Sequence, residues 1–216
     1  MSEPLEEKGP HQGQELLMTG KGLESAGAAM ILIHGRGASA EDIMELSVHL
    51  PHPDLAVMAP QATNHTWYPY SFLAPLAQNE PYLSSALQMV AGLVTQIESA
   101  GIPPKKIIIG GFSQGACLAS EFAARNAQRY GGLLLFSGGL IGPPGTPRDY
   151  PGSLAGTPVF IGCSDVDFHV PLERVEETAE ILTQLGATVN KKIYPNMGHT
   201  IIQDEIDQAQ LIVTTI

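Results

Sequence analysis

The segment IIIGGFSQGA, residues 107–116, decides the fold of this chain. Three β-branched isoleucines predict a buried strand, and residues 117–125 (CLASEFAAR) place apolar side chains at helical spacing directly after it. A strand that turns at once into a helix forces Ser113, at the corner, into a strained backbone conformation, and Gly111 and Gly115 relieve the crowding there. The Ser113 hydroxyl then projects from the corner, so the sequence predicts an exposed nucleophile. The G-x-S-x-G pattern is a weak signal alone in a chain with 23 glycines, and the strand and helix around it give it meaning.

Short apolar runs alternate with segments of helical period on both sides of this corner. We expect strands at residues 29–33, 55–58, 106–109, 133–136, 159–161 and 189–194, and helices at residues 40–49, 82–100, 113–128, 172–185 and 200–213. The first five strands are apolar almost throughout, as in parallel sheets that helices cover on both faces. The alternation predicts an α/β fold with a mainly parallel central sheet. We expect residues 1–216 to form a single domain, with residues 1–27 as an N-terminal extension or an edge strand.

The composition excludes several functional classes. A net charge of −11 argues against nucleic acid and anionic membrane surfaces as partners. Residues 1–14 lack the basic start and apolar stretch of a secretory signal, and no run approaches the length of a membrane span. We therefore expect a cytoplasmic protein without stable membrane insertion, acting on a small molecule. Metal-binding and nucleotide-binding motifs are absent, so we expect no metal and no cofactor, and we expect Cys117 and Cys163 to be buried free thiols.

A serine nucleophile requires a base whose pKa lies near the working pH, which favours histidine. In α/β-hydrolase chains the order is serine, acid, histidine, and two histidines, His169 and His199, follow Ser113. His199 is the better candidate because it lies on a short glycine-containing loop after the last strand. His169 stands two residues from the best acid and is poorly placed to face it.

The acid must orient the imidazole and stabilise its charged form. We choose Asp167, which follows the fifth predicted strand and begins a turn that leads into a helix at residue 171 or 172. Asp165, in the same loop, and Asp149, in the loop after the fourth predicted strand, stay open as alternatives.

Two backbone N–H groups are expected to bind the oxyanion that forms when the serine attacks a carbonyl. One belongs to Gln114, the residue after the nucleophile, and the other to Arg36, in the loop after the first predicted strand. We expect His34 to hold that loop by hydrogen bonding. The Arg36 side chain is expected either to be solvated or to lie at the mouth of the site, where it would favour acidic substrates.

Taken together, these motifs resemble the phospholipase/carboxylesterase family of small serine hydrolases, which includes the acyl-protein thioesterases. The resemblance extends from about residue 28 to the C-terminus. It rests on residues 34–38 (HGRGA), 60–62 (PQA), 67–68 (WY), 111–116 (GFSQGA), 167–171 (DFHVP) and 194–199 (YPNMGH). It implies an α/β-hydrolase fold without a large lid domain and hydrolysis of carboxylic esters or thioesters without a cofactor. Carried over, the resemblance makes Ser113, Asp167 and His199 the catalytic triad, with Arg36 and Gln114 at the oxyanion hole.

Three features depart from the family pattern. Arg36 replaces the usual leucine, which would make the nearby pocket more polar. The segment of residues 162–167 is two residues longer than the common glycine-to-aspartate spacing, which keeps Asp165 open. The segment of residues 69–73 (PYSFL) also lengthens the aromatic loop and is expected to narrow the site.

We therefore predict a serine carboxylesterase that hydrolyses small to medium acyl esters, with Trp67 and Tyr68 walling the acyl or alcohol side. One alternative is an acyl-protein or acyl-CoA thioesterase or lysophospholipase, and a more distant one is a non-catalytic ligand-binding protein on the same scaffold. A cysteine-based hydrolase is disfavoured because Cys117 lies one helical turn past the corner. The aromatics of the Trp67 loop are also candidates for a homodimer contact.

Overall fold

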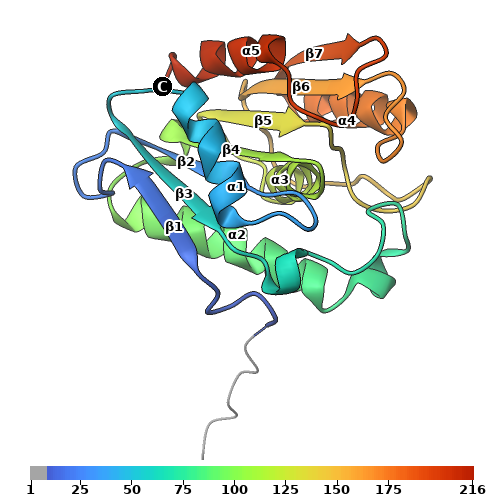
Figure 1. Ribbon diagram of the computed structural model, residues 1–216, viewed down its shortest axis with the longest axis horizontal. Coiled ribbons are helices and arrows are strands. Elements are labelled where there is room, and N and C mark those ends of the chain that lie inside the picture. The colour runs from blue at the N-terminus through green and yellow to red at the C-terminus, as the bar shows by residue number, and fades with distance from the viewer. Residues whose placement is uncertain (1–8) are drawn as a thin grey trace, which may run out of the picture.

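The computed structural model describes residues 9–216, so residues 1–8 of the predicted N-terminal extension lie outside the described residues. Within them, seven strands form one sheet in the order β1-β3-β2-β4-β5-β6-β7 (Figure 1). The strands are β1 (Leu16–Gly20), β2 (Ala28–Ile33), β3 (Leu55–Pro60), β4 (Ile107–Phe112), β5 (Gly132–Phe136), β6 (Pro158–Ser164) and β7 (Thr188–Tyr194). β1 pairs antiparallel with β3, and the other neighbouring strands are parallel. The predicted mainly parallel sheet is confirmed, with residues 16–20 as its edge strand.

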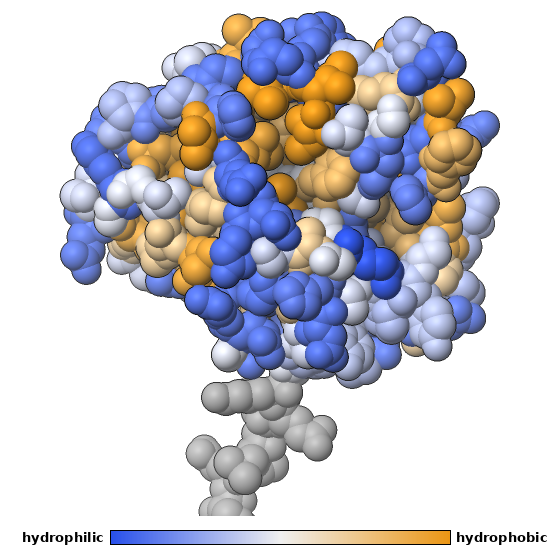
Figure 2. All heavy atoms as spheres, in the orientation of Figure 1, coloured by the Kyte–Doolittle hydropathy of each residue, from blue (hydrophilic) through white to orange (hydrophobic). Residues whose placement is uncertain are grey.

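Helices cover both faces of this sheet, because alternate side chains of its buried strands point to opposite sides. In β2, Ala29, Ile31 and Ile33 belong to the core that also contains buried residues of α2 (Tyr82–Ser99), α3 (Gln114–Arg125) and α4 (Leu172–Gln184). The intervening residues 28, 30 and 32 belong to a second core with α1 (Ala40–Met44) and α5 (Gln203–Val213). On the face drawn in Figure 2, hydrophilic side chains run along α1, and hydrophobic side chains gather between α1 and α5. The predicted α/β-hydrolase architecture is therefore confirmed, and no large lid covers the sheet within residues 9–216.

Three helices differ at their ends from the prediction. The helix expected over residues 40–49 is α1 followed by a 3₁₀ helix, Glu45–His49. The helix after Ser113 ends at Arg125 rather than 128, where Asn126 leaves the helical conformation and its side chain binds the carbonyl of Phe122. The last helix begins at Gln203 rather than 200.

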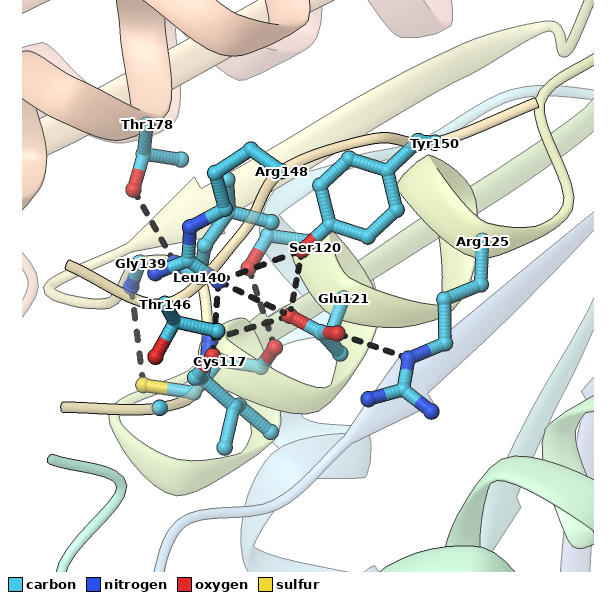
Figure 3. A network of polar contacts seen from close by, with 12 residues as sticks. Cys117, Ser120, Glu121, Arg125, Gly139, Leu140, Thr146, Arg148, Tyr150 and Thr178 are labelled. Atoms are coloured by element: carbon cyan, nitrogen blue, oxygen red, sulfur yellow. Dashed lines mark hydrogen bonds and ion pairs between the residues drawn. The ribbon is translucent and has the colours of Figure 1, made fainter. Parts of the chain in front are cut away.

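The long connection between β5 and β6, residues 137–157, is fastened to α3 by a buried polar network (Figure 3). At its centre the Glu121 carboxylate accepts hydrogen bonds from the N–H of Ile141 (3.0 Å), the hydroxyl of Tyr150 (3.1 Å) and Nε of Arg125 (2.7 Å). The Cys117 thiol accepts a further bond from the N–H of Gly139 (3.5 Å). The network holds this connection in place beside the carboxyl ends of the strands.

The helices and the cysteines of residues 9–216 bear on two predictions made from the sequence. Between residues 9 and 216 no helix has both the length and the hydrophobicity needed to cross a membrane. Cys117 and Cys163 are buried free thiols, as predicted.

Candidate active site

Ser113 lies at the sharp turn between β4 and α3 with φ 55° and ψ −118°, a conformation that costs energy for a residue with a side chain. Glycine is required on both sides of it. A Cβ on Gly111 would lie 2.6 Å from the carbonyl oxygen of Ile33 in the neighbouring strand, and a Cβ on Gly115 would overlap the same oxygen. The strained corner and its two glycines are thus confirmed, and the backbone N–H of Ser113 is tied to the carbonyl of Phe136 in β5 (2.9 Å).

A continuous chain of hydrogen bonds joins the three predicted triad residues. The Oγ of Ser113 lies 2.8 Å from Nε2 of His199, and Nδ1 of His199 lies 2.6 Å from Oδ2 of Asp167. Because the carboxylate can only accept, Nδ1 of His199 carries the ring proton and Nε2 is left to accept the proton of the serine hydroxyl. The His199 ring packs against the rings of Phe112 and His169, whose centres each lie 4.8 Å from its own.

The surroundings of Asp167 favour its ionised carboxylate. Its side chain is fully buried, and burial works against the charged form. Hydrogen bonds from His199 and from the N–H groups of His169 (2.8 Å) and Val170 (3.0 Å) outweigh that effect and hold the pKa of Asp167 below its ordinary value. A charged carboxylate beside His199 favours the protonated imidazole that proton transfer from the serine creates.

The two alternative acids lie elsewhere. Asp165 is exposed, and its Oδ1 accepts a hydrogen bond from the N–H of Asn196 (2.8 Å), so it ties the loop after β6 to the loop after β7. Asp149 lines a separate cavity with Tyr150 and Arg125. Of the three aspartates, Asp167 is the one that contacts His199.

The loop after β2 lies against the nucleophile. A Cβ on Gly35 would lie 3.4 Å from Cβ of Ser113. Within residues 9–216 the backbone N–H groups of Arg36 and Gln114 make no hydrogen bond. The Gln114 N–H opens the first turn of α3, where the helix dipole favours negative charge. Arg36 and Gln114 line the same pocket as Ser113, so their N–H groups are candidate donors for an oxyanion there.

His34 holds this loop, as predicted. Its Nδ1 binds the carbonyl of Gly35 (2.7 Å), and its Nε2 accepts the N–H of Ala62 (3.1 Å). Burial lowers the pKa of His34, which keeps the ring neutral with its proton on Nδ1. The histidine is structural, since both ring nitrogens are engaged in the backbone.

The Gln114 side chain has a role that the sequence did not reveal. Its Oε1 accepts the N–H of Trp67 (2.9 Å), and its Nε2 donates to the carbonyl of Tyr68 (2.9 Å). One residue therefore offers its main chain to the site and fixes the aromatic loop with its side chain.

The predicted substrate wall is wrong for Trp67. Its side chain is fully buried, its indole N–H donates to the carbonyl of His34 (2.9 Å), and its ring packs between the rings of His34 and His11, away from the pocket beside Ser113. Sequence reasoning also missed His11, a buried histidine that binds the carbonyl of Trp67 (2.9 Å), and no nearby motif could have revealed it. Tyr68 does line the pocket.

The pocket beside Ser113 has a volume of about 430 Å³. Residues 69–72 form one wall, so the lengthened aromatic loop borders the site as expected, and Arg36, Val170 and His169 complete the rim. Cys117 also contacts this pocket, but burial raises the pKa of its thiol to about 12, and a protonated thiol is a poor nucleophile.

A second pocket of about 290 Å³ lies between α1 and the start of α5 and shares Gly35, Ala38, Phe112 and His199 with the first. It is lined mainly by apolar side chains, among them Ile43, Leu46 and Ile201, in the region where Figure 2 shows hydrophobic side chains at the surface. An ester bound at Ser113 thus has two spaces available for its two halves, and Arg36 borders the first of them.

Comparisons with known proteins agree with this geometry. The family model for Phospholipase/Carboxylesterase matches residues 18–216. The crystal structure of a phospholipase/carboxylesterase from Dyadobacter fermentans superposes with a TM-score of 0.90 at 44% identity, covering 94% of this chain and 97% of that one. Acyl-protein thioesterase 1 of Gibberella zeae is 33% identical over 127 residues, 55% of this chain and 51% of that protein. Lysophospholipase-like protein 1 of Mus musculus is 23% identical over 206 residues, 87% of this chain and 86% of that protein. The match to the thioesterase therefore spans about half of its length.

Proposed function

Since the chain belongs to the phospholipase/carboxylesterase family, we propose that it is a serine carboxylesterase that hydrolyses small to medium acyl esters. The observation that carries this proposal is the unbroken hydrogen-bond chain from Ser113 through His199 to Asp167. The two unpaired N–H groups of Arg36 and Gln114 beside the serine support it.

The proposed reaction has two stages. The Oγ of Ser113 attacks the ester carbonyl and passes its proton to Nε2 of His199, while Asp167 stabilises the resulting imidazolium. The carbonyl oxygen becomes an oxyanion that accepts hydrogen bonds from the N–H groups of Arg36 and Gln114. His199 returns the proton to the leaving alcohol, which departs and leaves an acyl-enzyme. Water then attacks the acyl group, gives its proton to His199, and the carboxylic acid leaves as Ser113 takes that proton back.

Labelling with a fluorophosphonate tests the nucleophile directly. We expect the wild type to be labelled and Ser113→Ala to be unlabelled, with turnover of p-nitrophenyl butyrate reduced by about 10⁶. Ser71→Ala is the matched control, because it removes another hydroxyl from the same pocket and should keep the label. Equal labelling of the wild type and Ser113→Ala would overturn the proposal.

A thioesterase acting on acylated proteins is the second candidate, favoured by the similarity to the acyl-protein thioesterases. The guanidinium of Arg36 at the pocket beside Ser113 supports the smaller esters instead, because a long acyl chain placed in that pocket would lie against a charged group. A series of oxygen esters and thioesters with acyl chains of increasing length separates the two. If kcat/KM is highest for the long-chain thioesters of this series, the thioesterase replaces the carboxylesterase as the proposed function.

A cytoplasmic location and a homodimer stay predictions. For the dimer, Trp67 and Tyr68 are buried and offer no contact surface, whereas Tyr70 on the same loop is 57% exposed. Sedimentation of the wild type against Tyr70→Ser would test a contact through this loop.

A further inference from the structure

Arg36 presents a fixed guanidinium to the pocket beside Ser113. Its two terminal nitrogens donate to the carbonyls of Pro69 (2.8 Å) and Tyr70 (2.6 Å), and the group lies 5.9 Å from the centre of the Tyr68 ring. A guanidinium has five N–H donors, so two bonds to carbonyl oxygens leave three donors free. The aromatic loop thereby holds the cation at the pocket without neutralising it.

The surroundings of Arg36 contain no compensating acid. Among residues 9–216, Arg125, Arg148 and Arg174 each form an ion pair with a glutamate, but no carboxylate lies within 4.0 Å of the Arg36 guanidinium. Nor does any aspartate or glutamate line this pocket. Asp167, behind His199, has no exposed side-chain surface.

The neighbouring pocket is lined by one acid, Asp42, whose carboxylate accepts hydrogen bonds from the backbone N–H and the hydroxyl of Ser39 (2.7 and 3.0 Å). The whole chain has a net charge of −11, whereas this pocket is bordered by an arginine without an ion-pair partner and by no acid, so its local charge has the opposite sign. Such a site attracts an anion to a protein that otherwise repels one.

We infer that the ester substrate carries a carboxylate, and that Arg36 is the specificity-determining residue that binds it; the inference rests on the proposed function. The planar fork of a guanidinium matches the two oxygens of a carboxylate. The carboxylate sits on the half of the ester that occupies the pocket bordered by Arg36, and the other half takes the second pocket, lined by Ile43 and Ile201.

Two matched pairs of esters test the inference and place the carboxylate. Monomethyl glutarate against methyl pentanoate compares a charged with a neutral acyl group, and 3-(butanoyloxy)benzoic acid against phenyl butanoate does so for the alcohol. The readout is the ratio of kcat/KM for the charged ester to that for its neutral partner, which cancels any effect on the oxyanion donor of Arg36. In the wild type we expect this ratio to exceed one for at least one pair, and that pair identifies the half that carries the charge.

Arg36→Leu is expected to lower this ratio by tenfold or more, and Arg36→Lys by less, since lysine keeps the charge but not the fork. Arg129→Leu is the control: Arg129 also donates to a backbone carbonyl, that of Gly156, and its loss changes the net charge equally, but it lies outside the pocket. The control should leave the ratio unchanged. A second readout uses the wild type alone, where the preference for the charged ester should weaken as ionic strength rises from 20 to 500 mM.

The outcomes separate the two proposals. Hydrolysis of neutral esters with the same charged-to-neutral ratio in the wild type and Arg36→Leu overturns the inference and leaves the esterase proposal standing. A wild-type ratio below one for both pairs overturns it as well. No hydrolysis of any of the four esters overturns the proposed function and, with it, the inference.

Discussion

The replacement Glu205→Gln should make the stability of this protein less dependent on pH. Glu205 lies in the first turn of α5, fully buried, where its Oε2 accepts the N–H of Ile202 (3.0 Å). Its Oε1 faces Gly162 of β6 and has no hydrogen-bond partner among the described residues. Burial, with a smaller contribution from the charge of Asp204, raises the pKa of Glu205 from 4.5 to about 7.

The sign of the effect follows from which state holds the proton. Between pH 4.5 and 7 the folded protein keeps Glu205 protonated while the unfolded chain has it ionised, so the free energy of unfolding decreases as the pH rises through this range. Each pH unit corresponds to about 1.4 kcal/mol, which gives a total loss of about 3 kcal/mol that is complete above pH 7. Glutamine is neutral throughout, and its amide oxygen can still accept the N–H of Ile202.

Urea unfolding of both proteins at pH 4.5, 6 and 8 measures this difference. The free energy of unfolding of Glu205→Gln minus that of the wild type should increase by about 3 kcal/mol from the lowest pH to the highest. The unpaired amide N–H₂ of the glutamine adds a cost that does not change with pH, so it cancels from the comparison. A difference that stays constant within about 0.5 kcal/mol would refute the reasoning, because the carboxyl would then ionise equally in both states.

Three further replacements test the site and its support. Asp167→Asn should lower kcat on p-nitrophenyl esters by about 10⁴, because an amide N–H₂ toward Nδ1 favours the wrong tautomer of the base; an effect below tenfold would remove Asp167 as the acid. Gly115→Ala should lower the free energy of unfolding by about 3 kcal/mol or more, because its Cβ would overlap a backbone oxygen of β2. Gly92→Ala is the control: it adds a Cβ into open space at an exposed helical position and should raise the free energy of unfolding by about 0.5–1 kcal/mol. Thermal denaturation measures both. Glu121→Gln should lower the free energy of unfolding in urea by about 3 kcal/mol, because it replaces a buried carboxylate that accepts hydrogen bonds from three donors with a neutral amide. An unchanged free energy of unfolding would show that the network does not stabilise the fold.

The order of the segments was sufficient to predict that Ser113, Asp167 and His199 lie close together, because each lies at or in the loop after the carboxyl end of a parallel strand. Strands are recognisable from local apolar runs, and the ends of parallel strands meet at one edge of a sheet. The glycines around Ser113 were likewise predictable from local geometry alone.

The aromatic loop was predicted less well, because a loop has no side-chain period to show which way a residue points. Trp67 and Tyr68 are adjacent, yet one is held inward by His34 and the other lines the pocket. The burial of Glu121 was equally hidden, since it depends on a connection of about 20 residues that folds back onto α3. In both cases the deciding contacts join segments that are far apart in the chain.

The position of β7 explains why the last helix begins later than the sequence predicted. β7 is the edge strand opposite β1, three strand spacings from β4, which is about 14 Å. Residues 195–199 carry the chain from the end of β7 to His199, whose Nε2 lies 2.8 Å from Oγ of Ser113, so this loop connects the edge of the sheet to the nucleophile. Residues 200–202 are not helical, and α5 begins at Gln203. The hydrogen bonds from Asn196 to Asp165 and from Ile202 to Glu205 fix the two ends of this excursion, so the distance from His199 to Ser113 depends on the edge of the sheet as much as on the strand that carries the nucleophile.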